Sequence, residues 1–237
     1  MIHSTKNPVE IVIFSLKCDD GKRNFLYRSL SDDEKQRAAA FRFDKHRNRF
    51  ITGRGSIREI LADKGNCSPR DIEFELNKYG KPSVFKPESV RWMQFNASSS
   101  ATMGAIAISI SKGIAVGLDI EKIKPDNKRD YDLIVKNEFT NDEYVWYKKH
   151  RDSDRIRVFF ELWTCKEAYL KALGIGLSGG LDSFTIDLEG PEPRVSRTTL
   201  EKGEQSGLSL HRLSINDDYV ACLALPEKTG RIDLSYW

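Results

Sequence analysis

The sequence predicts an α+β fold, because helix and strand patterns are mixed in both halves of the chain. The chain has 237 residues, 39% hydrophobic and 31% charged, which is ordinary for a globular protein. A chain of this length buries roughly 70% of the surface that it exposes when unfolded, so it needs no disulfide or metal ion to fold. No short-period repeat is present. These observations favour one large domain or two modest ones.

The first half of the chain begins with an expected strand at residues 10–17. Its apolar run, residues 11–16, is too short for a signal sequence or a membrane span. Ser31-Asp-Asp-Glu34 is a capping box that opens a helix reaching Phe41. A second helix is expected over about residues 44–63, ended by Lys64-Gly65. Further strands are expected at 72–76, 92–97 and 104–111, with a turn at 79–82 and a serine-rich bend near residues 98–100.

The second half repeats this mixture of elements. Residues 114–120 alternate as a strand, and residues 142–149 and 159–173 have helical patterns. Two late strands are expected at 184–188 and 219–225. The segment 189–207 is rich in proline, glycine and charge, and we interpret it as a surface excursion.

Charge and cysteine usage exclude several classes of protein. The formal net charge of +3 is too small for an obligate nucleic-acid binder or a polybasic membrane anchor. The charge is nevertheless uneven, since residues 1–112 carry 20 basic and 13 acidic side chains and residues 113–237 carry 18 and 22. The four cysteines form no CxxC pair, which argues against a zinc site and a disulfide scaffold. We therefore expect reduced thiols in a cytoplasmic protein.

The first chemical signal is an acidic strand, Ile114-Ala-Val-Gly-Leu-Asp-Ile-Glu121. Alternation places its large apolar residues on one face and Asp119 and Glu121 side by side on the other, next to small residues. Mg²⁺ prefers one or two such carboxylates together with phosphate oxygens of a substrate. The alternative is an ordinary half-buried strand with a solvated acidic edge.

The second signal is a helix that carries an acid and a base. Glu167 and Lys171 are four residues apart and share one face, with Trp163 one turn earlier on that face. The carboxylate could serve a metal ion and the ammonium a phosphate. The alternative is a surface ion pair worth a few tenths of a kcal/mol.

Two further segments could bind anions. Arginine side chains suit phosphate oxygens, and a basic stretch consists of Arg37, Arg42, Lys45, Arg47, Arg49, Arg54 and Arg58. No nucleic-acid recognition motif accompanies it, and a solvated helix face would explain about half of it. Lys81, stiffened by Pro82, and the small residues 96–100 could also cup an anion, although a plain polar turn is the default for each.

In this order, the motifs resemble the 4′-phosphopantetheinyl transferase superfamily, most closely its long monomeric type that activates peptide- and polyketide-synthase carrier domains in secondary metabolite biosynthesis. The resemblance rests on Gly117-Leu-Asp119-Ile-Glu121 followed by Trp163-Thr-Cys-Lys166-Glu167-Ala-Tyr-Leu-Lys171. It is supported by Tyr79-Gly-Lys-Pro82, Phe95-Asn-Ala-Ser98, Phe41-Arg-Phe43, Gly174-Ile-Gly-Leu-Ser178 and Leu181-Asp-Ser-Phe184.

The resemblance implies that coenzyme A donates its phosphopantetheine arm to a serine of an apo acyl or peptidyl carrier protein, releasing adenosine 3′,5′-bisphosphate. Asp119, Glu121 and Glu167 would hold Mg²⁺ (or Mn²⁺), which withdraws charge from the phosphorus under attack. Lys171 would neutralise a phosphate oxygen. Glu167, directly or through a metal-bound water, would take the proton of the carrier serine.

The resemblance also assigns a cofactor site, to which we expect Arg37, Lys81, Ser98, Ser99 and Lys171 to contribute, together with Arg49 and Arg54. One residue departs from the family, because Ser99 stands where a phosphate-binding histidine is usual. Serine carries no charge. We therefore expect either weaker binding of coenzyme A or compensation by a nearby arginine.

The implied fold has two similar α+β lobes related by pseudo-twofold symmetry, residues 1–112 and 113–237, with the active site in the cleft between them. The basic lobe would hold the cofactor phosphates and the acidic lobe the metal ion. A carrier protein would dock on residues 125–157, and the enzyme would be a monomer without nucleic-acid or membrane partners. Two alternatives remain, a metal-dependent phosphodiesterase or nuclease and a non-catalytic protein that binds coenzyme A or a carrier.

Overall fold

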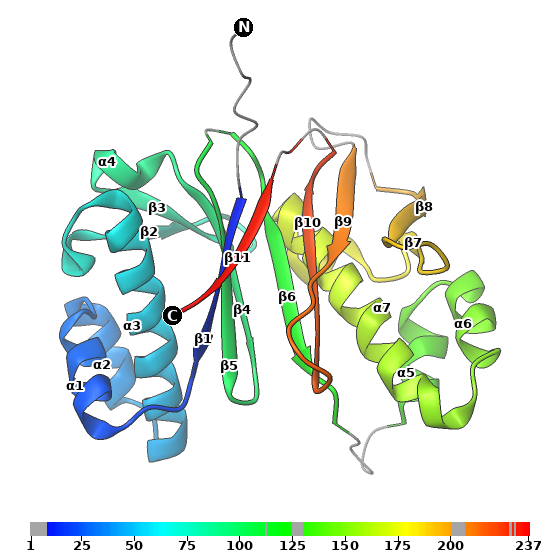
Figure 1. Ribbon diagram of the computed structural model, residues 1–237, viewed down its shortest axis with the longest axis horizontal. Coiled ribbons are helices and arrows are strands. Elements are labelled where there is room, and N and C mark those ends of the chain that lie inside the picture. The colour runs from blue at the N-terminus through cyan, green and yellow to red at the C-terminus, as the bar shows by residue number, and fades with distance from the viewer. Residues whose placement is uncertain (1–8, 112, 125–129, 201–206, 228, 230) are drawn as a thin grey trace, which may run out of the picture.

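Two β-sheets pack face to face in the middle of the molecule, and a long helix covers the outer face of each sheet (Figure 1). This architecture is seen in a computed structural model that describes residues 9–111, 113–124, 130–200, 207–227, 229 and 231–237. The layers follow the order α3, first sheet, second sheet, α7. The predicted α+β class is confirmed.

The first sheet has the strand order β11-β1-β5-β4. Strand β1 (Val9–Ser15) lies antiparallel to β5 (Met103–Ser109), which pairs antiparallel with β4 (Gln94–Ser100). On the other side of β1 lies β11 (Ile232–Tyr236), in parallel orientation. The last strand of the chain therefore completes the sheet that the first strand begins.

The second sheet has the order β6-β10-β9. Its central strand β10 (Tyr219–Pro226) pairs antiparallel with both β6 (Gly117–Lys122) and β9 (Leu208–Arg212). Strands β6 and β4 lie side by side at the junction of the two sheets (Figure 1).

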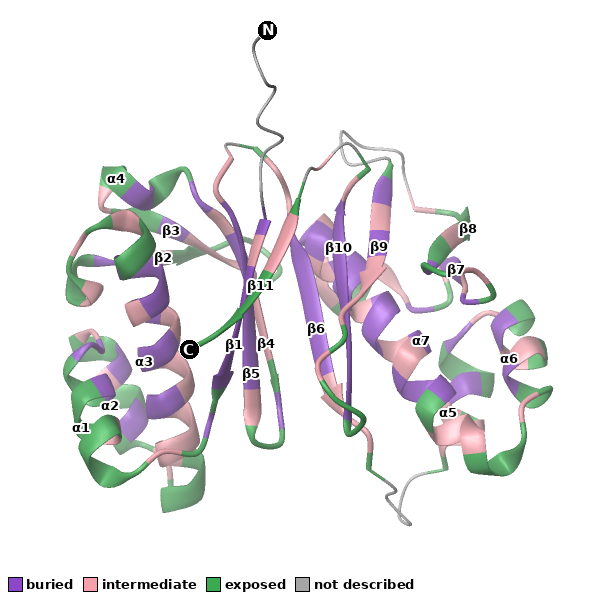
Figure 2. Ribbon diagram, in the orientation of Figure 1, coloured by how far each residue is buried: buried purple, intermediate pink, exposed green. Residues whose placement is uncertain are grey.

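Helices α3 (Asp44–Gly65) and α7 (Asp152–Leu173) have 22 residues each and end in a left-handed cap residue, Asn66 and Gly174 respectively. Figure 2 shows that each helix buries one face against its sheet and leaves the other accessible. Apolar side chains fill the spaces between α3 and the first sheet, between the two sheets, and between the second sheet and α7. The three layers of core side chains fix the sheets and helices relative to one another.

The remaining elements surround this frame. Helices α1 (Asp20–Arg28) and α2 (Asp32–Ala39) pack beside α3, and α5 (Tyr131–Glu138) and α6 (Asn141–Lys148) pack beside α7. Strands β2 (Glu73–Leu76) and β3 (Pro82–Lys86) form a hairpin that is followed by α4 (Glu88–Arg91). Short 3₁₀ turns lie at Pro69–Asp71 and Gly176–Gly179, and β7 (Phe184–Asp187) pairs with β8 (Arg194–Thr198).

Several predicted elements are present, some elements such as α1 and β11 were not predicted, and one predicted feature is wrong. The Ser31 capping box is present, with the backbone N–H of Ser31 donating to the Glu34 carboxylate at 3.2 Å. The expected serine-rich bend is wrong, because Ser98, Ser99 and Ser100 continue strand β4 and pair with β5. The chain reverses at Ala101 and Thr102 instead, where Ala101 has a φ of 48°. No helix among the described residues is long and apolar enough to cross a membrane.

Candidate functional site

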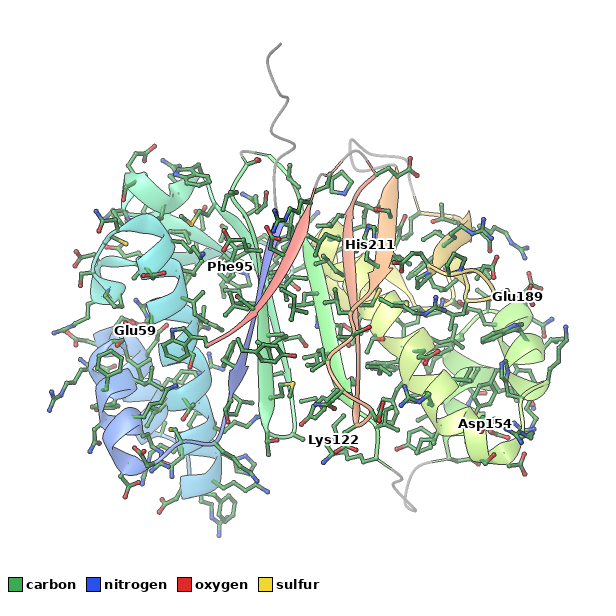
Figure 3. The ribbon with its side chains drawn as sticks, viewed as in Figure 1. Glu59, Phe95, Lys122, Asp154, Glu189 and His211 are labelled. Carbon is green, nitrogen blue, oxygen red and sulfur yellow. The ribbon has the colours of Figure 1, made fainter. Side chains whose placement is uncertain are left out.

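A polar seam of Asn96, Ser98 and Ser100 joins β4 to β6. Alternation along β4 turns these side chains toward β6, while Phe95 packs into the core beside α3 (Figure 3). The side-chain oxygen of Asn96, Oδ1, accepts from the backbone N–H of Leu118 at 2.8 Å, and the Ser100 hydroxyl accepts from that of Lys122 at 3.1 Å. The serine-rich segment therefore continues as a strand because its side chains bind the neighbouring strand.

The same seam holds two of the predicted metal ligands. The Ser98 hydroxyl donates to Asp119 Oδ1 at 2.7 Å, and the Ser100 hydroxyl donates to Glu121 Oε2 at 2.5 Å. The Lys171 ammonium also binds Asp119 Oδ1, at 2.6 Å. Asp119 is only 3% exposed, and its other oxygen, Oδ2, is buried without a hydrogen-bond partner. A buried carboxylate oxygen without a partner is costly unless a ligand satisfies it.

Asp119, Glu121 and Glu167 form an acidic cluster. Burial raises the pKa of Glu121, to which the Asp119 charge adds, and burial likewise raises the pKa of Glu167, with Asp119 and Glu121 adding to the shift. The Lys171 ammonium lies 4.0 Å from the Glu167 carboxylate and opposes the rise. The three carboxylates therefore sense one another's charge within a partly desolvated space.

Gly117 allows α7 to approach β6 closely enough to build this cluster. A Cβ atom at residue 117 would lie 2.0 Å from the Ala168 carbonyl oxygen and 2.3 Å from the Ala172 nitrogen. Only glycine leaves room for the helix backbone at this distance. The glycine of the acidic-strand motif thus sets the separation between Asp119 on β6 and the Glu167 and Lys171 side chains on α7.

The acidic cluster suits a hard divalent cation in charge and in donor type. Within the described part of the chain, no three acidic, histidine or cysteine side chains already stand in a metal-binding arrangement. The Lys171 ammonium lies on Asp119 Oδ1, and the unpartnered Oδ2 is the oxygen left for another cation. Mg²⁺ usually takes one or two carboxylates from a protein and completes its coordination with water and phosphate oxygens.

A second part of the site is a cavity of about 540 Å³ that we call the cationic pocket. Its basic side chains are Arg37, His46, Arg49 and Arg54, and it is also lined by Ser98 and Ser99. The aromatic rings of Phe41 and Phe50 supply an apolar wall, with Phe50 beneath the Arg37 guanidinium at 5.1 Å. Because Ser98 lines this pocket and also binds Asp119, the cationic pocket adjoins the acidic cluster.

Ser99 lies in the cationic pocket in direct contact with Arg49. Arg49 Nη2 donates to the Ser99 hydroxyl at 3.0 Å and to its carbonyl oxygen at 3.2 Å, and Arg49 Nη1 donates to the carbonyl of Ala101. The Arg49 guanidinium therefore lies directly against Ser99. The expected compensation by a nearby arginine stays a prediction.

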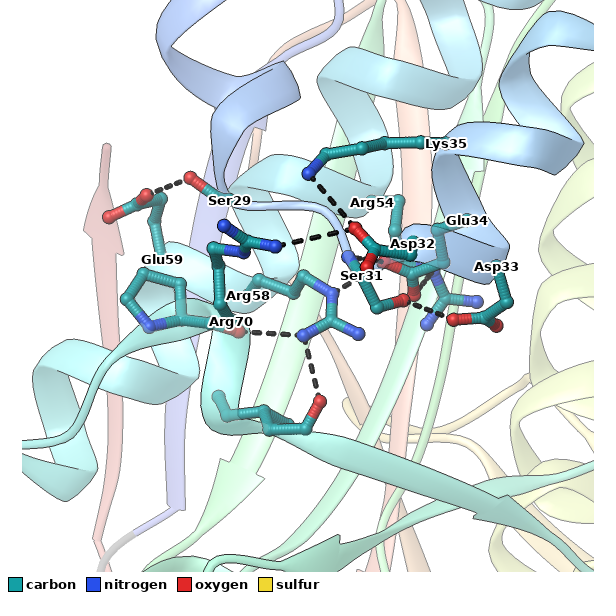
Figure 4. Close-up of polar contacts among 12 residues, drawn as sticks. Ser29, Ser31, Asp32, Asp33, Glu34, Lys35, Arg54, Arg58, Glu59 and Arg70 are labelled. Carbon is teal, nitrogen blue, oxygen red and sulfur yellow. Dashed lines mark hydrogen bonds and ion pairs between the residues drawn. The ribbon is translucent and has the colours of Figure 1, made fainter.

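Arg54 reaches the cationic pocket from a buried polar network at the start of α2 (Figure 4). Its Nε lies 3.3 Å from the Glu34 carboxylate, which also accepts from Arg58 Nε at 2.6 Å. Arg58 is 2% exposed and donates further to the carbonyls of Pro69 and Ile72. Arg58 thus ties α2 and the start of β2 to α3, whereas Arg54 retains access to the cavity.

Lys81 lies outside the residues that line the cationic pocket. Its ammonium donates to the carbonyls of Lys171 at 2.7 Å, Val116 at 3.1 Å and Ala172 at 3.5 Å. Burial lowers the pKa of Lys81 to about 8. Its predicted part in cofactor binding stays a prediction.

Lys166, which directly precedes Glu167, is fully buried. Its ammonium lies 2.8 Å from the Glu143 carboxylate and donates to the carbonyls of Leu181 and Phe184, each at 2.6 Å. Glu143 also accepts from the backbone N–H groups of Thr140 and Ile186. The pair therefore anchors α6 and β7 to the helix that carries Glu167.

A further cavity of about 520 Å³ lies where Glu121 meets aromatic residues of α5 and α7. Its aromatic lining is Tyr131, Phe159, Phe160 and Trp163. The segment predicted to dock a carrier, residues 125–157, includes α5 and α6, and its residues 125–129 lie outside the described part of the chain.

Sequence reasoning missed His46, and it assigned Asn96 and Ser100 to an anion-binding bend when their side chains in fact bind β6. His46 lies three residues before Arg49, so helical spacing alone could have placed both on one face of α3. The period-two series Asn96, Ser98, Ser100 indicates one polar face of a strand, but the assumption of a bend hid that signal.

Comparisons with known proteins show relatives that match most of the chain. Residues 115–224 match the family model for the 4′-phosphopantetheinyl transferase superfamily. The chain is 34% identical over 200 residues to 4′-phosphopantetheinyl transferase HetI from Nostoc sp., covering 84% of this chain and 80% of that protein. It is 29% identical to a phosphopantetheinyl transferase from Thraustochytrium sp., covering 87% of this chain and 73% of that protein. It is 26% identical to the human L-aminoadipate-semialdehyde dehydrogenase-phosphopantetheinyl transferase, with coverages of 86% and 69%.

Proposed function

Because this chain belongs to the 4′-phosphopantetheinyl transferase superfamily, we propose that it transfers the 4′-phosphopantetheine arm of coenzyme A to a serine of an apo carrier protein. The second product is adenosine 3′,5′-bisphosphate. The reaction is proposed to take place in the cytoplasm, by a monomer that needs no nucleic-acid or membrane partner. The observation that carries the proposal is the position of the acidic cluster and Lys171 directly beside the cationic pocket, joined to it by Ser98.

The cationic pocket suits the nucleotide end of coenzyme A. Arg37, Arg49 and Arg54, with His46, offer guanidinium and imidazole donors to phosphate oxygens. Phe41 and Phe50 offer an apolar surface for the adenine ring. With the bisphosphate held there, the pyrophosphate extends past Ser98 toward Asp119 and Lys171.

Asp119, Glu121 and Glu167 would hold Mg²⁺, because their oxygens form the acidic cluster and Asp119 Oδ2 has no other partner. When bound, the ion withdraws charge from the phosphorus under attack and from the leaving phosphate. The cluster is thus the part of the site on which a dependence on a divalent cation would rest.

The protein's own groups act around the reacting phosphorus. Lys171, fixed by Asp119 and within 3.3 Å of the Ser98 hydroxyl, neutralises charge on a phosphate oxygen. Glu167 would take the proton of the carrier serine, directly or through a water molecule. The serine oxygen then forms its bond to phosphorus as the bond to the adenosine bisphosphate breaks.

The proposal is tested by incubating the protein with coenzyme A, Mg²⁺ and an apo carrier protein, and weighing the carrier by mass spectrometry. We expect the carrier to gain one phosphopantetheine on its active serine. Hydrolysis of coenzyme A or of nucleotides without any gain on several carriers would favour a phosphodiesterase. Binding of coenzyme A without either reaction would favour a non-catalytic protein.

Arg49→Ala is expected to raise the KM for coenzyme A by about tenfold to a hundredfold. A charge-assisted hydrogen bond to phosphate contributes about 1.5–3 kcal/mol, and Arg49 supplies the cation beside Ser99. Steady-state kinetics with varied coenzyme A measure this change, and Arg42→Ala on the preceding exposed turn is the matched control. An unchanged KM in the Arg49 variant would contradict the assignment.

Ser99→His is expected to leave the KM for coenzyme A within about twofold of the wild-type value. The imidazole would add a donor but would displace the Arg49 guanidinium from the Ser99 hydroxyl. The measurement is the same kinetic titration. A KM that falls tenfold, or about 1.4 kcal/mol, would mean that Arg49 does not compensate and that the natural site is weakened.

A carrier protein is proposed to dock near residues 125–157, close to the cavity that Glu121 shares with α5 and α7. Carrier domains are usually acidic, so basic side chains at the edge of that surface would guide their approach. Lys124 lines the same cavity as Glu121 and is one such side chain.

A further inference from the structure

The turn of the two-stranded β2–β3 hairpin contacts the end of α7. Asn77 shapes this turn, since its side-chain oxygen accepts from the backbone N–H groups of Tyr79 and Lys81 at 2.9 Å each. Gly80 supports the turn with a φ of 85°, which glycine adopts without strain. The turn is therefore built to present the Asn77 and Lys81 side chains outward from the hairpin.

Both side chains bind backbone carbonyls at the C-terminal end of α7. The Asn77 amide donates to the carbonyl of Gly174 at 2.8 Å. The Lys81 ammonium donates to the carbonyls of Lys171 and Ala172. The last carbonyls of a helix lack partners within the helix and carry partial negative charge, so an ammonium and an amide stabilise them.

Lys81 binds β6 as well as α7. Its ammonium donates to the carbonyl of Val116, the residue before Gly117, where α7 leaves no room for a Cβ atom. This one side chain therefore pins the two elements that carry Asp119 and Lys171, whose contact measures 2.6 Å. Burial lowers the Lys81 pKa to about 8, and the three carbonyl oxygens replace water as acceptors for the buried ammonium.

We infer that Asn77 and Lys81 form an inter-lobe latch, and that they are positioning residues which hold the end of α7 so that Lys171 and Glu167 stay aligned with Asp119. The latch acts on the chemical step rather than on the binding of the nucleotide, because neither residue lines the cationic pocket. A displacement of about 1 Å at a catalytic group lowers the rate by as much as a hundredfold. The kinetic consequence rests on the proposed transferase function.

Two substitutions each remove one hydrogen-bond donor of the latch. Lys81→Met removes the cation and retains the length of the side chain. Asn77→Asp retains the oxygen that shapes the turn and replaces the amide donor to Gly174 with a second oxygen. Lys78→Met is the matched control, because Lys78 is exposed on the same turn and its ammonium lies 4.7 Å from the centre of the Tyr79 ring.

We expect both latch variants to lower kcat by about tenfold or more while the KM for coenzyme A stays within about twofold of wild type. Amide hydrogen exchange in the peptide that spans residues 168–175 should become at least about tenfold faster in both, with Lys78→Met unchanged in every respect. The exchange measurement needs no substrate, so it tests the latch even if no carrier is modified.

The inference is overturned if Lys81→Met raises the KM for coenzyme A by about tenfold while Asn77→Asp matches wild type, since Lys81 then binds the cofactor directly. It is also overturned if the exchange of residues 168–175 is unchanged in both variants. Thermal unfolding of each variant shows that the comparison is made on folded protein.

Discussion

Glu167→Gln is expected to lower kcat for phosphopantetheine transfer by about a hundredfold or more without loss of the fold. The substitution removes the proposed base and one of the three proposed ligands of Mg²⁺, while the side chain keeps its size. Mass spectrometry of the carrier protein over time measures the rate. Near-complete retention of the rate would contradict both assignments of Glu167.

The same substitution is expected to raise the thermal stability at neutral pH when no divalent cation is present. Burial raises the pKa of Glu167 above its unfolded value, so the carboxyl contributes stability while it is protonated and loses that contribution as pH rises through the folded pKa. Glutamine has no charge to desolvate. A loss of activity together with a gain in stability indicates a functional carboxylate. Damage to the fold would lower both the activity and the stability.

The control for Glu167→Gln is Glu161→Gln, on the same helix but facing the cavity beside Arg157. It should retain the wild-type rate. Mg²⁺ should raise the melting temperature of the wild type and of Glu161→Gln, because a ligand that binds only the folded state stabilises it. A rise of equal size in Glu167→Gln would remove this residue from the proposed metal site.

Lys166→Met is expected to destabilise the protein by about 3–5 kcal/mol, because it leaves the Glu143 carboxylate buried without its cation. For a chain of this size the melting temperature should fall by roughly 6–20 °C. Lys166 is also the donor to the carbonyls of Leu181 and Phe184, which would lose their partner. Chemical denaturation and calorimetry measure the change.

Lys148→Met is the matched control for the buried pair. Lys148 forms an ion pair with Asp132 in which both side chains are more than one-third exposed. Such surface pairs contribute about 0–1 kcal/mol, so its melting temperature should stay close to wild type. Equal effects of the two lysine substitutions would show that the Glu143–Lys166 pair contributes no more than a surface contact.

The contrast between Lys166 and Lys171 shows what the sequence could reveal. Lys166 and Lys171 lie on the same helix at motif positions, and sequence reasoning assigned a role to Lys171 from its spacing to Glu167. The burial of Lys166 depends on Glu143, 23 positions earlier on another helix, and on loops that follow α7. Helical periodicity carries no information on such distant partners.

The acidic strand was predictable because alternation is a local property. Leu118 and Ile120 lie in the core between the sheets and Asp119 faces the seam, as the period of two requires. The serine segment was misassigned because small polar residues favour turns in isolation. Its strand conformation depends on hydrogen bonds to β6, about twenty residues later, which are tertiary contacts.

Helix boundaries near strong local signals were close to the expected ones, as the Ser31 capping box and the left-handed cap at Gly174 illustrate. Helix α1 and strand β11 were missed. Strand β11 forms because it pairs with the edge of β1, more than 200 residues earlier in the sequence. The local pattern of residues 232–236 does not reveal such a distant partner.

Strand β4 has a consequence for the kinds of genetic change that this protein can tolerate. Its Ser98 and Ser100 side chains bind Asp119 and Glu121, its Asn96 side chain binds the β6 backbone, and Ser99 on the opposite face contacts Arg49 of the cationic pocket. Deletion or insertion of a single codon within the strand would shift its pairing register by one residue and exchange the two faces. Both halves of the site would fail in one event, so variation in length should be confined to the flanking loops while single substitutions accumulate within the strand.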